Sequence, residues 1–223
     1  MADRPHARWL ATVRAARLLL HLRQEGVTDP DVLAAVETIR RAAFVDDPAL
    51  DDLSFEDAML PIPCGQVMLR PSTTAHLLQA MGLKRDRQAR VLMIGFGSGY
   101  MAALLSQLAA HVYAVERYMS LAVQGRERFT RLGIRNTTIS YADGLDGWPE
   151  KAPFEAIVLT GAVSAIPEGL SGQLVRGGRL VVPLKDASGQ VAIVSLDASG
   201  EVIARQPLFQ WVPQLVEGRA QVL

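Results

Sequence analysis

The sequence predicts an α/β fold, in which a mostly parallel sheet is preceded by helices and followed by a β-hairpin. Three observations lead to this prediction. Short apolar runs alternate with helical segments after residue 90, the first 45 residues show helical spacing, and the turn sequence Asp-Ala-Ser-Gly occurs twice near the end. Strands separated by helices pair in parallel through right-handed crossovers. We expect the 223 residues to form one domain, made of a helical segment (1–60), an α/β core (61–185) and a hairpin extension (186–223).

The first 45 residues are predicted to be helical. Apolar side chains recur there at helical spacing, with arginines between them. The series consists of Trp9, Leu10, Val13, Ala16 and Leu20. A second helix should begin at the sequence Thr-Asp-Pro-Asp, residues 28–31. Pro30 suits a first turn, and the side chains of Thr28 and Asp31 can accept hydrogen bonds from free amides.

An acidic stretch follows at residues 46–57, where six carboxylates occur without a basic residue. Such a cluster could attract a cation or a basic partner. Its acids lack the regular spacing of metal ligands, so we expect a solvated connecting loop. No metal site is predicted elsewhere, because the four histidines are scattered and Cys64 is the single cysteine. Cys64 has no evident histidine partner and is expected to be a small buried thiol.

The parallel sheet is predicted from short apolar runs. Residues 90–96 are almost wholly apolar, as in a strand covered on both faces. Helices are expected at 100–110 and 120–132, and the second should end at Gly133, which suits a left-handed cap. Further parallel strands are expected at 111–116, 137–143, 156–161 and 178–184. The Asp-Ala-Ser-Gly turns separate two β-rich segments, 190–196 and 201–211, which we predict to form the terminal hairpin.

The composition excludes several classes of protein. The 23 basic and 23 acidic residues leave no net charge, which argues against a nucleic-acid partner held through its phosphates. A single cysteine excludes an internal disulfide framework. The chain has no apolar run of about 20 residues and no signal-peptide pattern. We therefore predict no membrane partner and a cytoplasmic location.

A glycine-rich loop is the first candidate for a ligand site. Gly95, Gly97 and Gly99 stand where a buried strand turns into a helix. Without Cβ atoms the backbone can turn tightly and lie against a ligand that faces the amides of the helix start. Glu116 ends the next strand, 21 residues after Gly95. In a doubly wound sheet this places its carboxylate beside a bound ribose.

The spacing of the glycines favours one kind of ligand. A dinucleotide fingerprint needs a small residue at position 100, where this chain has Tyr100. A pyrophosphate is therefore less expected than S-adenosylmethionine, which has a ribose and an adenine but no phosphate. Asp143, followed by Gly144, ends the third strand and could accept a hydrogen bond from the adenine amine. The pair Asp143-Gly144 also fits an ordinary turn, and Glu116 could simply pair with Arg117.

Several longer segments carry a more specific pattern. They are 22–27, 43–45, 55–62, 143–150 (Asp-Gly-Leu-Asp-Gly-Trp-Pro-Glu), 166–168, 177–183 and 211–213. With these segments the chain resembles the protein-L-isoaspartate O-methyltransferase family over nearly its whole length. The resemblance implies a seven-stranded, Rossmann-like methyltransferase sheet. It also implies S-adenosylmethionine bound at Gly95, Gly97, Gly99, Glu116, Asp143 and Gly144. The implied reaction is methyl transfer to an isoaspartyl carboxylate of a protein or peptide, which begins protein repair.

The chain departs from the family at one central position. The family signature Gly-Gln-Thr-Ile-Ser-x-Pro reads Gly-Gln-Val-Met-Leu-Arg-Pro here, so Leu69 replaces the active-site serine and Val67 the threonine. An ionised carboxylate is already a nucleophile, and alignment can supply about 7–11 kcal/mol of barrier reduction. A lost hydrogen bond costs about 0.5–1.5 kcal/mol, although leucine also desolvates a carboxylate. Gln66 or Arg70 could compensate.

Three hydroxyls and three alternative functions remain open at this point. Ser72, Thr73 and Thr74 directly follow the segment that differs from the family signature, and we expect them to cap a helix at 72–81. The first alternative is a methyltransferase of the same fold with a different acceptor. The second is a non-catalytic, adenosyl-binding regulatory protein. The third and weakest is a nucleotide-dependent oxidoreductase.

Overall fold

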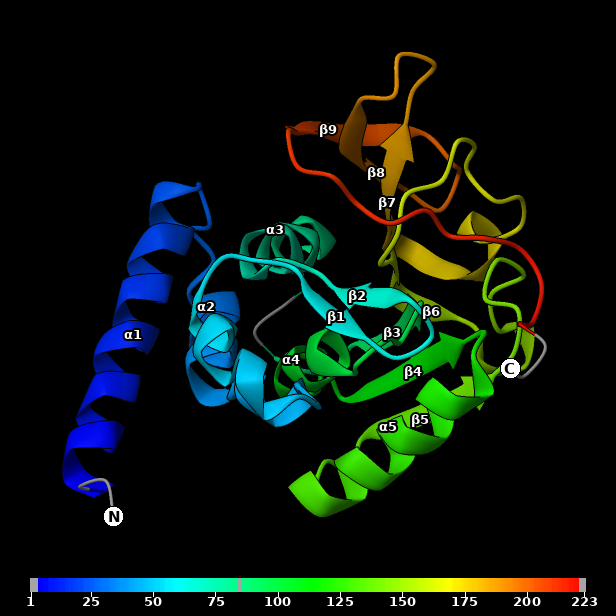
Figure 1. Ribbon diagram of the computed structural model, residues 1–223. Helices are drawn as coiled ribbons and strands as arrows, with labels where there is room; N and C mark the ends of the chain where they lie inside the picture. The colour runs from blue at the N-terminus through cyan, green and yellow to red at the C-terminus, as the bar shows by residue number, and fades with distance from the viewer. Residues whose placement is uncertain (1–3, 84–85, 221–223) are drawn as a thin grey trace.

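The architecture is a seven-stranded sheet with helices packed against it (Figure 1). The computed structural model describes residues 4–83 and 86–220. The strand order is β5-β4-β3-β6-β7-β8-β9, in which β5 to β7 run parallel and β8 and β9 are antiparallel to their neighbours. The predicted fold class, a mostly parallel α/β sheet with a C-terminal hairpin, is confirmed.

The strands of the main sheet have the following bounds: β3 (Arg90–Ile94), β4 (His111–Glu116), β5 (Thr137–Tyr141), β6 (Phe154–Leu159), β7 (Leu174–Lys185), β8 (Val191–Leu196) and β9 (Val202–Leu208). The helices are α1 (Arg4–Gln24), α2 (Pro30–Thr38), α3 (Pro71–Met81), α4 (Tyr100–Leu108) and α5 (Met119–Leu132). Short 3₁₀ helices are η1 (Arg41–Phe44), η2 (Pro48–Phe55), η3 (Pro149–Lys151) and η4 (Ser171–Gln173). Every predicted core strand and helix is present, with ends shifted by a few residues.

The helices contribute to one of two apolar cores. Residues of α1 to α5 pack with one set of inward-facing strand residues, whereas the other set packs with loop residues such as Leu170 and Trp148. The strand-to-strand links on that second side contain only η3 and η4. The alternating strand positions thus divide the sheet between a helical layer and a layer of irregular chain.

Helix α1 does not bury the residues that predicted it. Trp9, Val13 and Leu20 have exposed fractions of 61%, 45% and 55%, while Leu18 and Leu22 are buried in the core. Apolar residues surround more of this helix than one face, so the spacing predicted a helix without showing which side packs. None of the helices that the structure describes is long and apolar enough to cross a membrane.

Two expectations for the N-terminal region are wrong in detail. The cap of α2 is Asp29, whose Oδ1 accepts from the amides of Asp31 and Val32, while Thr28 bonds to Gln79 instead. The acidic stretch is not a loop, because most of it forms the 3₁₀ helix η2. Within residues 4–83 and 86–220, no group of three or more potential ligand side chains is placed to hold a metal ion.

A small hairpin, β1 (Leu60–Ile62) and β2 (Gln66–Met68), lies outside the main sheet. It passes in front of α4 and the parallel strands (Figure 1). Its turn contains Cys64 and Gly65, both with φ of 64°. Cys64 is exposed, so the expectation of a buried thiol is wrong; its Sγ lies 3.1 Å from the Ser120 hydroxyl. The hairpin places residues 66–69 near the carboxyl ends of the parallel strands.

The two Asp-Ala-Ser-Gly sequences form the predicted turns. Asp186 Oδ1 accepts from the amides of Ser188 and Gln190, and Asp197 Oδ1 accepts in the same way from Ser199 and Glu201. Each aspartate therefore replaces backbone partners within its own turn. The first turn joins β7 to β8 and the second joins β8 to β9.

Candidate functional site

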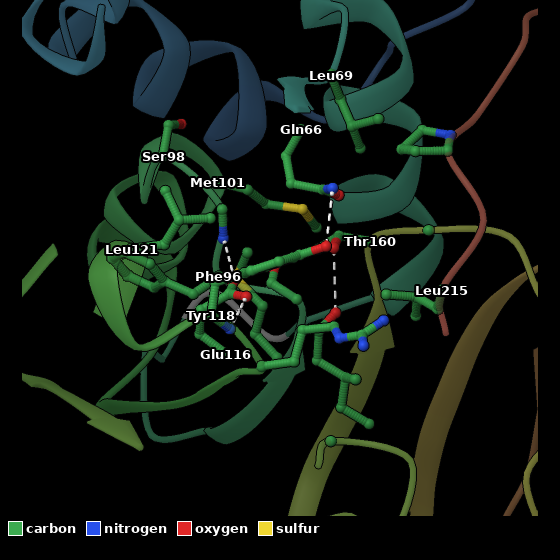
Figure 2. A pocket seen from close by; sticks show the side chains of 18 of the residues that line it. Gln66, Leu69, Phe96, Ser98, Met101, Glu116, Tyr118, Leu121, Thr160 and Leu215 are labelled. Carbon is green, nitrogen blue, oxygen red and sulfur yellow. Dashed lines mark hydrogen bonds between the residues drawn. The ribbon is translucent and has the colours of Figure 1, made fainter. Parts of the chain in front are cut away.

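The candidate site is a cleft at the carboxyl ends of β3, β4 and β6 (Figure 2). Its walls come from the loops after these strands, from hairpin strand β2 and the residue after it, and from the C-terminal segment 213–216. Strand β3 lies between β4 and β6. The connection after β3 leads to one side of it, and the connection after β5 leads back to the other side. Ligands of open α/β sheets bind at such a switch point.

The glycine loop forms one side of the cleft. Gly95 and Gly97 have φ values of 90° and 56°, which glycine adopts readily. A Cβ on Gly95 would lie 2.3 Å from the Thr160 hydroxyl oxygen, so no other residue fits there without a shift. A Cβ on Gly97 would meet only Ile62, at 3.5 Å. Gly97 therefore keeps the backbone accessible from the cleft rather than preventing a clash.

Glu116 is the buried carboxylate of the cleft, with 4% of its surface exposed. Its Oε2 accepts from the Gly97 amide at 2.8 Å, and its Oε1 accepts from the Tyr118 amide at 2.9 Å. Burial raises the pKa of Glu116, and the hydrogen bonds from these amides partly oppose that shift. Each oxygen retains capacity for a second donor. The side chain can therefore accept two hydroxyls of a ligand.

Asp143 has two roles in the structure. It lines the cleft, as predicted, but its Oδ1 accepts from the Leu145 amide at 3.0 Å. Its Oδ2 accepts from the Gly218 amide, which ties the C-terminal segment to this edge of the sheet. Gly144 is required by packing, because a Cβ there would lie 2.5 Å from Ile94 Cγ2. The turn interpretation of this pair is confirmed, while the predicted bond from the adenine amine to Asp143 stays a prediction.

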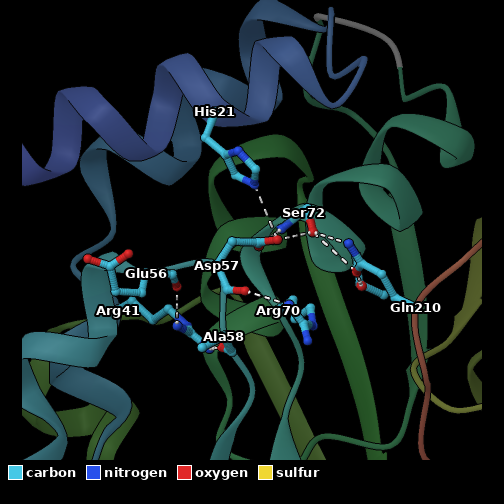
Figure 3. Close-up of polar contacts among 9 residues, drawn as sticks. His21, Arg41, Glu56, Asp57, Ala58, Arg70, Ser72 and Gln210 are labelled. Atoms are coloured by element: carbon cyan, nitrogen blue, oxygen red, sulfur yellow. Dashed lines mark hydrogen bonds and ion pairs between the residues drawn. The ribbon is translucent and has the colours of Figure 1, made fainter.

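The three candidate residues in the segment that differs from the family signature lie in two different places. Leu69 and Gln66 line the cleft, on the far side from Glu116 in Figure 2. Gln66 donates to the Cys64 carbonyl at 3.1 Å and to the Tyr118 hydroxyl at 3.2 Å. Arg70 lines a separate cavity and donates to the Asp57 carbonyl at 2.8 Å (Figure 3). Arg70 therefore does not supply a charge to the cleft.

Two of the three hydroxyls after Arg70 are committed to structure. The Ser72 hydroxyl donates to Asp57 at 2.7 Å, and the Thr73 hydroxyl donates to Gln210. The amide of Ser72 is capped by the Asp57 carboxylate at 2.8 Å, so the expectation that the hydroxyls cap this helix is wrong. Thr74 lies one residue further on and lines the cleft.

Arg41 is a functional candidate that the sequence patterns missed. It is 4% exposed, and its guanidinium donates to the carbonyls of Glu56, Ala58 and Leu69 at 3.3, 2.7 and 3.0 Å (Figure 3). Burial lowers its pKa to about 10, so it remains charged at neutral pH. It also lies 5.9 Å from the centre of the Tyr100 ring. An arginine in a helical segment, next to Arg40, has no spacing that could have revealed this position.

Comparison with known families connects this geometry to one of them. A family model described as Protein-L-isoaspartate(D-aspartate) O-methyltransferase (PCMT) matches residues 13–214. The chain belongs to this family. The predicted family and the assignment as an O-methyltransferase are thereby confirmed.

Named relatives extend over the same length. The protein-L-isoaspartate O-methyltransferase of Paramagnetospirillum magneticum is 42% identical over 211 residues, which are 93% of this chain and 97% of the relative. That of Xanthobacter autotrophicus is 47% identical over 74% of each chain. A solved structure named as a protein-L-isoaspartate O-methyltransferase is 26% identical, with a TM-score of 0.79, over 91% of this chain and 66% of its own.

A second solved structure shares the fold. It is described as a protein-L-isoaspartate O-methyltransferase from Plasmodium falciparum in complex with S-adenosyl-L-homocysteine. It is 22% identical, with a TM-score of 0.74, over 90% of this chain and 97% of its own. At this identity the likeness shows that the two chains share a fold.

Proposed function

We propose that the protein is an S-adenosylmethionine-dependent methyltransferase that esterifies an isoaspartyl carboxylate in a protein or peptide. Family membership supports the reaction, and one feature of the cleft carries the choice of donor. That feature is the buried carboxylate of Glu116, held by two amides beside the open backbone of Gly97. It suits the two hydroxyls of a ribose, while the glycine spacing does not suit a pyrophosphate.

The residues present fit this donor. Glu116 would hold the ribose, and Gly95 and Gly97 would lie against the rest of the molecule. Asp143 and Leu145 line the part of the cleft beside Gly144, where an adenine can be covered. Hairpin β1–β2 and segment 213–216 form the walls that would exclude water from the reacting groups.

The chain needs no general base for this reaction. When bound, S-adenosylmethionine supplies an electrophilic methyl group on a sulfonium, which an ionised carboxylate attacks directly. The residues of the cleft therefore act by binding, by alignment and by excluding water, which together can account for most of the rate. No side chain has to gain or lose a proton during the transfer. This explains how the reaction tolerates Leu69 at the position of the family's serine.

The direct test is methyl-ester formation on a synthetic isoaspartyl peptide with labelled donor. The wild-type protein should form ester, and Glu116→Ala should not. No ester above the level of Glu116→Ala would contradict the isoaspartyl activity. An aspartyl peptide of the same sequence is the matched substrate control, because it differs only in the carboxylate that is free.

A second candidate function is favoured by Leu69 and Val67, which make this wall of the cleft apolar. It keeps the donor and the methyl transfer but uses another acceptor. Labelled donor incubated with a cell lysate would then mark a protein while the isoaspartyl peptide stays unmodified. Donor binding by calorimetry without any labelled product would instead indicate a regulatory, non-catalytic role.

A further inference from the structure

The wall of the cleft around Leu69 is not entirely apolar. Thr74 and Tyr100 also line the cleft, and each is 2% exposed. Thr74 lies in the first turn of α3, just after Leu69 in the chain, and Tyr100 is the first residue of α4. Two different helices thus bring a hydroxyl to the same cleft that the serine of the family would have faced.

These two hydroxyls differ from their neighbours in their hydrogen bonds. Ser72 and Thr73 bond to Asp57 and Gln210. Within the part of the chain that the structure describes, the hydroxyls of Thr74 and Tyr100 form no hydrogen bond. Neither oxygen is among the enclosed, unpaired polar atoms of the described residues, so each keeps some accessible surface in a residue that lines the cleft. A hydroxyl that donates to no protein group is free to donate to a ligand.

A buried positive charge lies directly behind this wall. The Arg41 guanidinium holds the Leu69 carbonyl at 3.0 Å and lies 5.9 Å from the Tyr100 ring centre. Its hydrogen-bond partners are carbonyl groups, which carry no net charge. The carboxylate that acts on it most is Asp57, whose two oxygens already bind Ser72. In a poorly solvated site such a charge favours an anion.

The protonation state of Tyr100 suits the same ligand. Burial raises the pKa of Tyr100 to about 12, so its hydroxyl remains a donor at neutral pH. Threonine hydroxyls donate equally well. A carboxylate accepts only, and its hydrogen bonds to hydroxyls are stronger than those between neutral groups.

We propose that Thr74 and Tyr100 form the acceptor site and bind the carboxylate that is to be methylated. This rests on the proposed function and assigns its acceptor site to residues outside the signature. The hydroxyls hold one carboxylate oxygen and leave the other free to attack. The arginine charge behind Leu69 offsets the desolvation that the leucine imposes. In this chain two hydroxyls, on α3 and α4, take the role of the serine that the family signature has at position 69.

The test uses near-isosteric variants of the full-length protein. Thr74→Val and Tyr100→Phe should each lower kcat/KM for the isoaspartyl peptide about ten- to a hundredfold, mainly through KM, because a hydrogen bond to a charged group is lost. The Kd for S-adenosylmethionine, measured by calorimetry, should stay within about twofold and also shows that the variants are folded. Thr73→Val is the matched control, since its hydroxyl bonds to Gln210 and does not line the cleft.

A rescue separates binding from a structural role. Leu69→Ser in the Thr74→Val background should recover most of the lost kcat/KM, because it returns a hydroxyl to the same wall. If wild type forms ester while both variants match it, this acceptor site is wrong and the proposed function stands. A large increase in donor Kd in either variant would also overturn it, because the hydroxyl would then face the donor. If wild type forms no ester, the proposed function itself fails, and the carboxylate site with it.

Discussion

The two ends of the cleft are built in different ways. At the donor end, backbone geometry determines the shape of the site. A Cβ on Gly95 would clash with Thr160, and the Glu116 side chain is held by the amides of Gly97 and Tyr118. At the acceptor end, side chains decide the chemistry, with Leu69 forming an apolar wall and two hydroxyls left without protein partners among the described residues. A site formed by backbone groups tolerates few substitutions. In a site formed by side chains, a hydroxyl on one element can take the role of a hydroxyl on another.

The largest effect is expected from removing the charge at the donor end. Glu116→Ala deletes the acceptor for the ribose hydroxyls and also leaves the Gly97 and Tyr118 amides unpaired. The two charge-assisted hydrogen bonds from the ribose hydroxyls are lost, so the Kd for S-adenosylmethionine should rise at least about 100-fold in calorimetry. Glu127→Ala, an exposed change on α5, is the control. A change below tenfold would show that Glu116 does not hold the donor.

A smaller effect is expected from the arginine behind the acceptor end. Arg41→Met removes the donor for three carbonyls and should lower the free energy of unfolding by about 2–4 kcal/mol in urea titrations. If the comparison of the two ends is right, the KM for peptide should rise more than the Kd for the donor. Arg40→Met, at the exposed neighbouring position, should change neither quantity. Equal losses at both ends would mean that Arg41 serves only the fold.

Much of the fold was predictable because its signals are local. The apolar runs that became β3, β4 and β6, the glycine loop and the Asp186 and Asp197 turns each depend on residues close in the chain. The meeting of Gly95 and Glu116 at one cleft was predictable for the same reason, since both stand at strand ends whose positions follow from the alternation of elements. The division into segments 1–60, 61–185 and 186–223 stays a prediction.

The parts that escaped prediction depend on contacts between distant residues. Strands β1 and β2 have three residues each, too few for a pattern, and α1 packs through Leu18 and Leu22 rather than through the series that predicted it. Arg41 and Leu69 are 28 residues apart, and Asp143 and Gly218 are 75 apart. No spacing rule connects such pairs, so the acceptor end required the structure.

A third prediction concerns acid, which should act on the donor end alone. Burial raises the pKa of Glu116 above its usual value of 4.5, and ribose binding requires the ionised form. As the pH falls through the raised pKa, the free protein gains a proton that donor binding must expel, so affinity weakens. The Kd should be flat well above the raised pKa and rise as the pH falls through it, by at most about tenfold per unit. Glu116→Gln binds more weakly but should show no such slope; an equal slope would assign the proton elsewhere.

The smallest effect is expected where the two ends meet. Gln66, on the hairpin, donates to the Tyr118 hydroxyl at 3.2 Å, and the Tyr118 amide holds Glu116. Gln66→Leu removes the side-chain hydrogen bond and leaves the hairpin backbone in place. One neutral hydrogen bond is worth about 0.5–1.5 kcal/mol, so the dissociation rate of the donor should rise about two- to tenfold in stopped-flow measurements.

The matched control for Gln66→Leu is on the same hairpin. Cys64→Ser keeps a polar atom facing the Ser120 hydroxyl, which lies 3.1 Å from the Cys64 thiol in the wild-type protein. This variant should leave the dissociation rate unchanged. Because β2 continues into Leu69, loosening it disturbs the acceptor wall and the donor cover together. An unchanged rate in Gln66→Leu would mean that the hairpin does not retain the donor. The two ends of the cleft would then act independently, and Tyr118 would belong to the donor end alone.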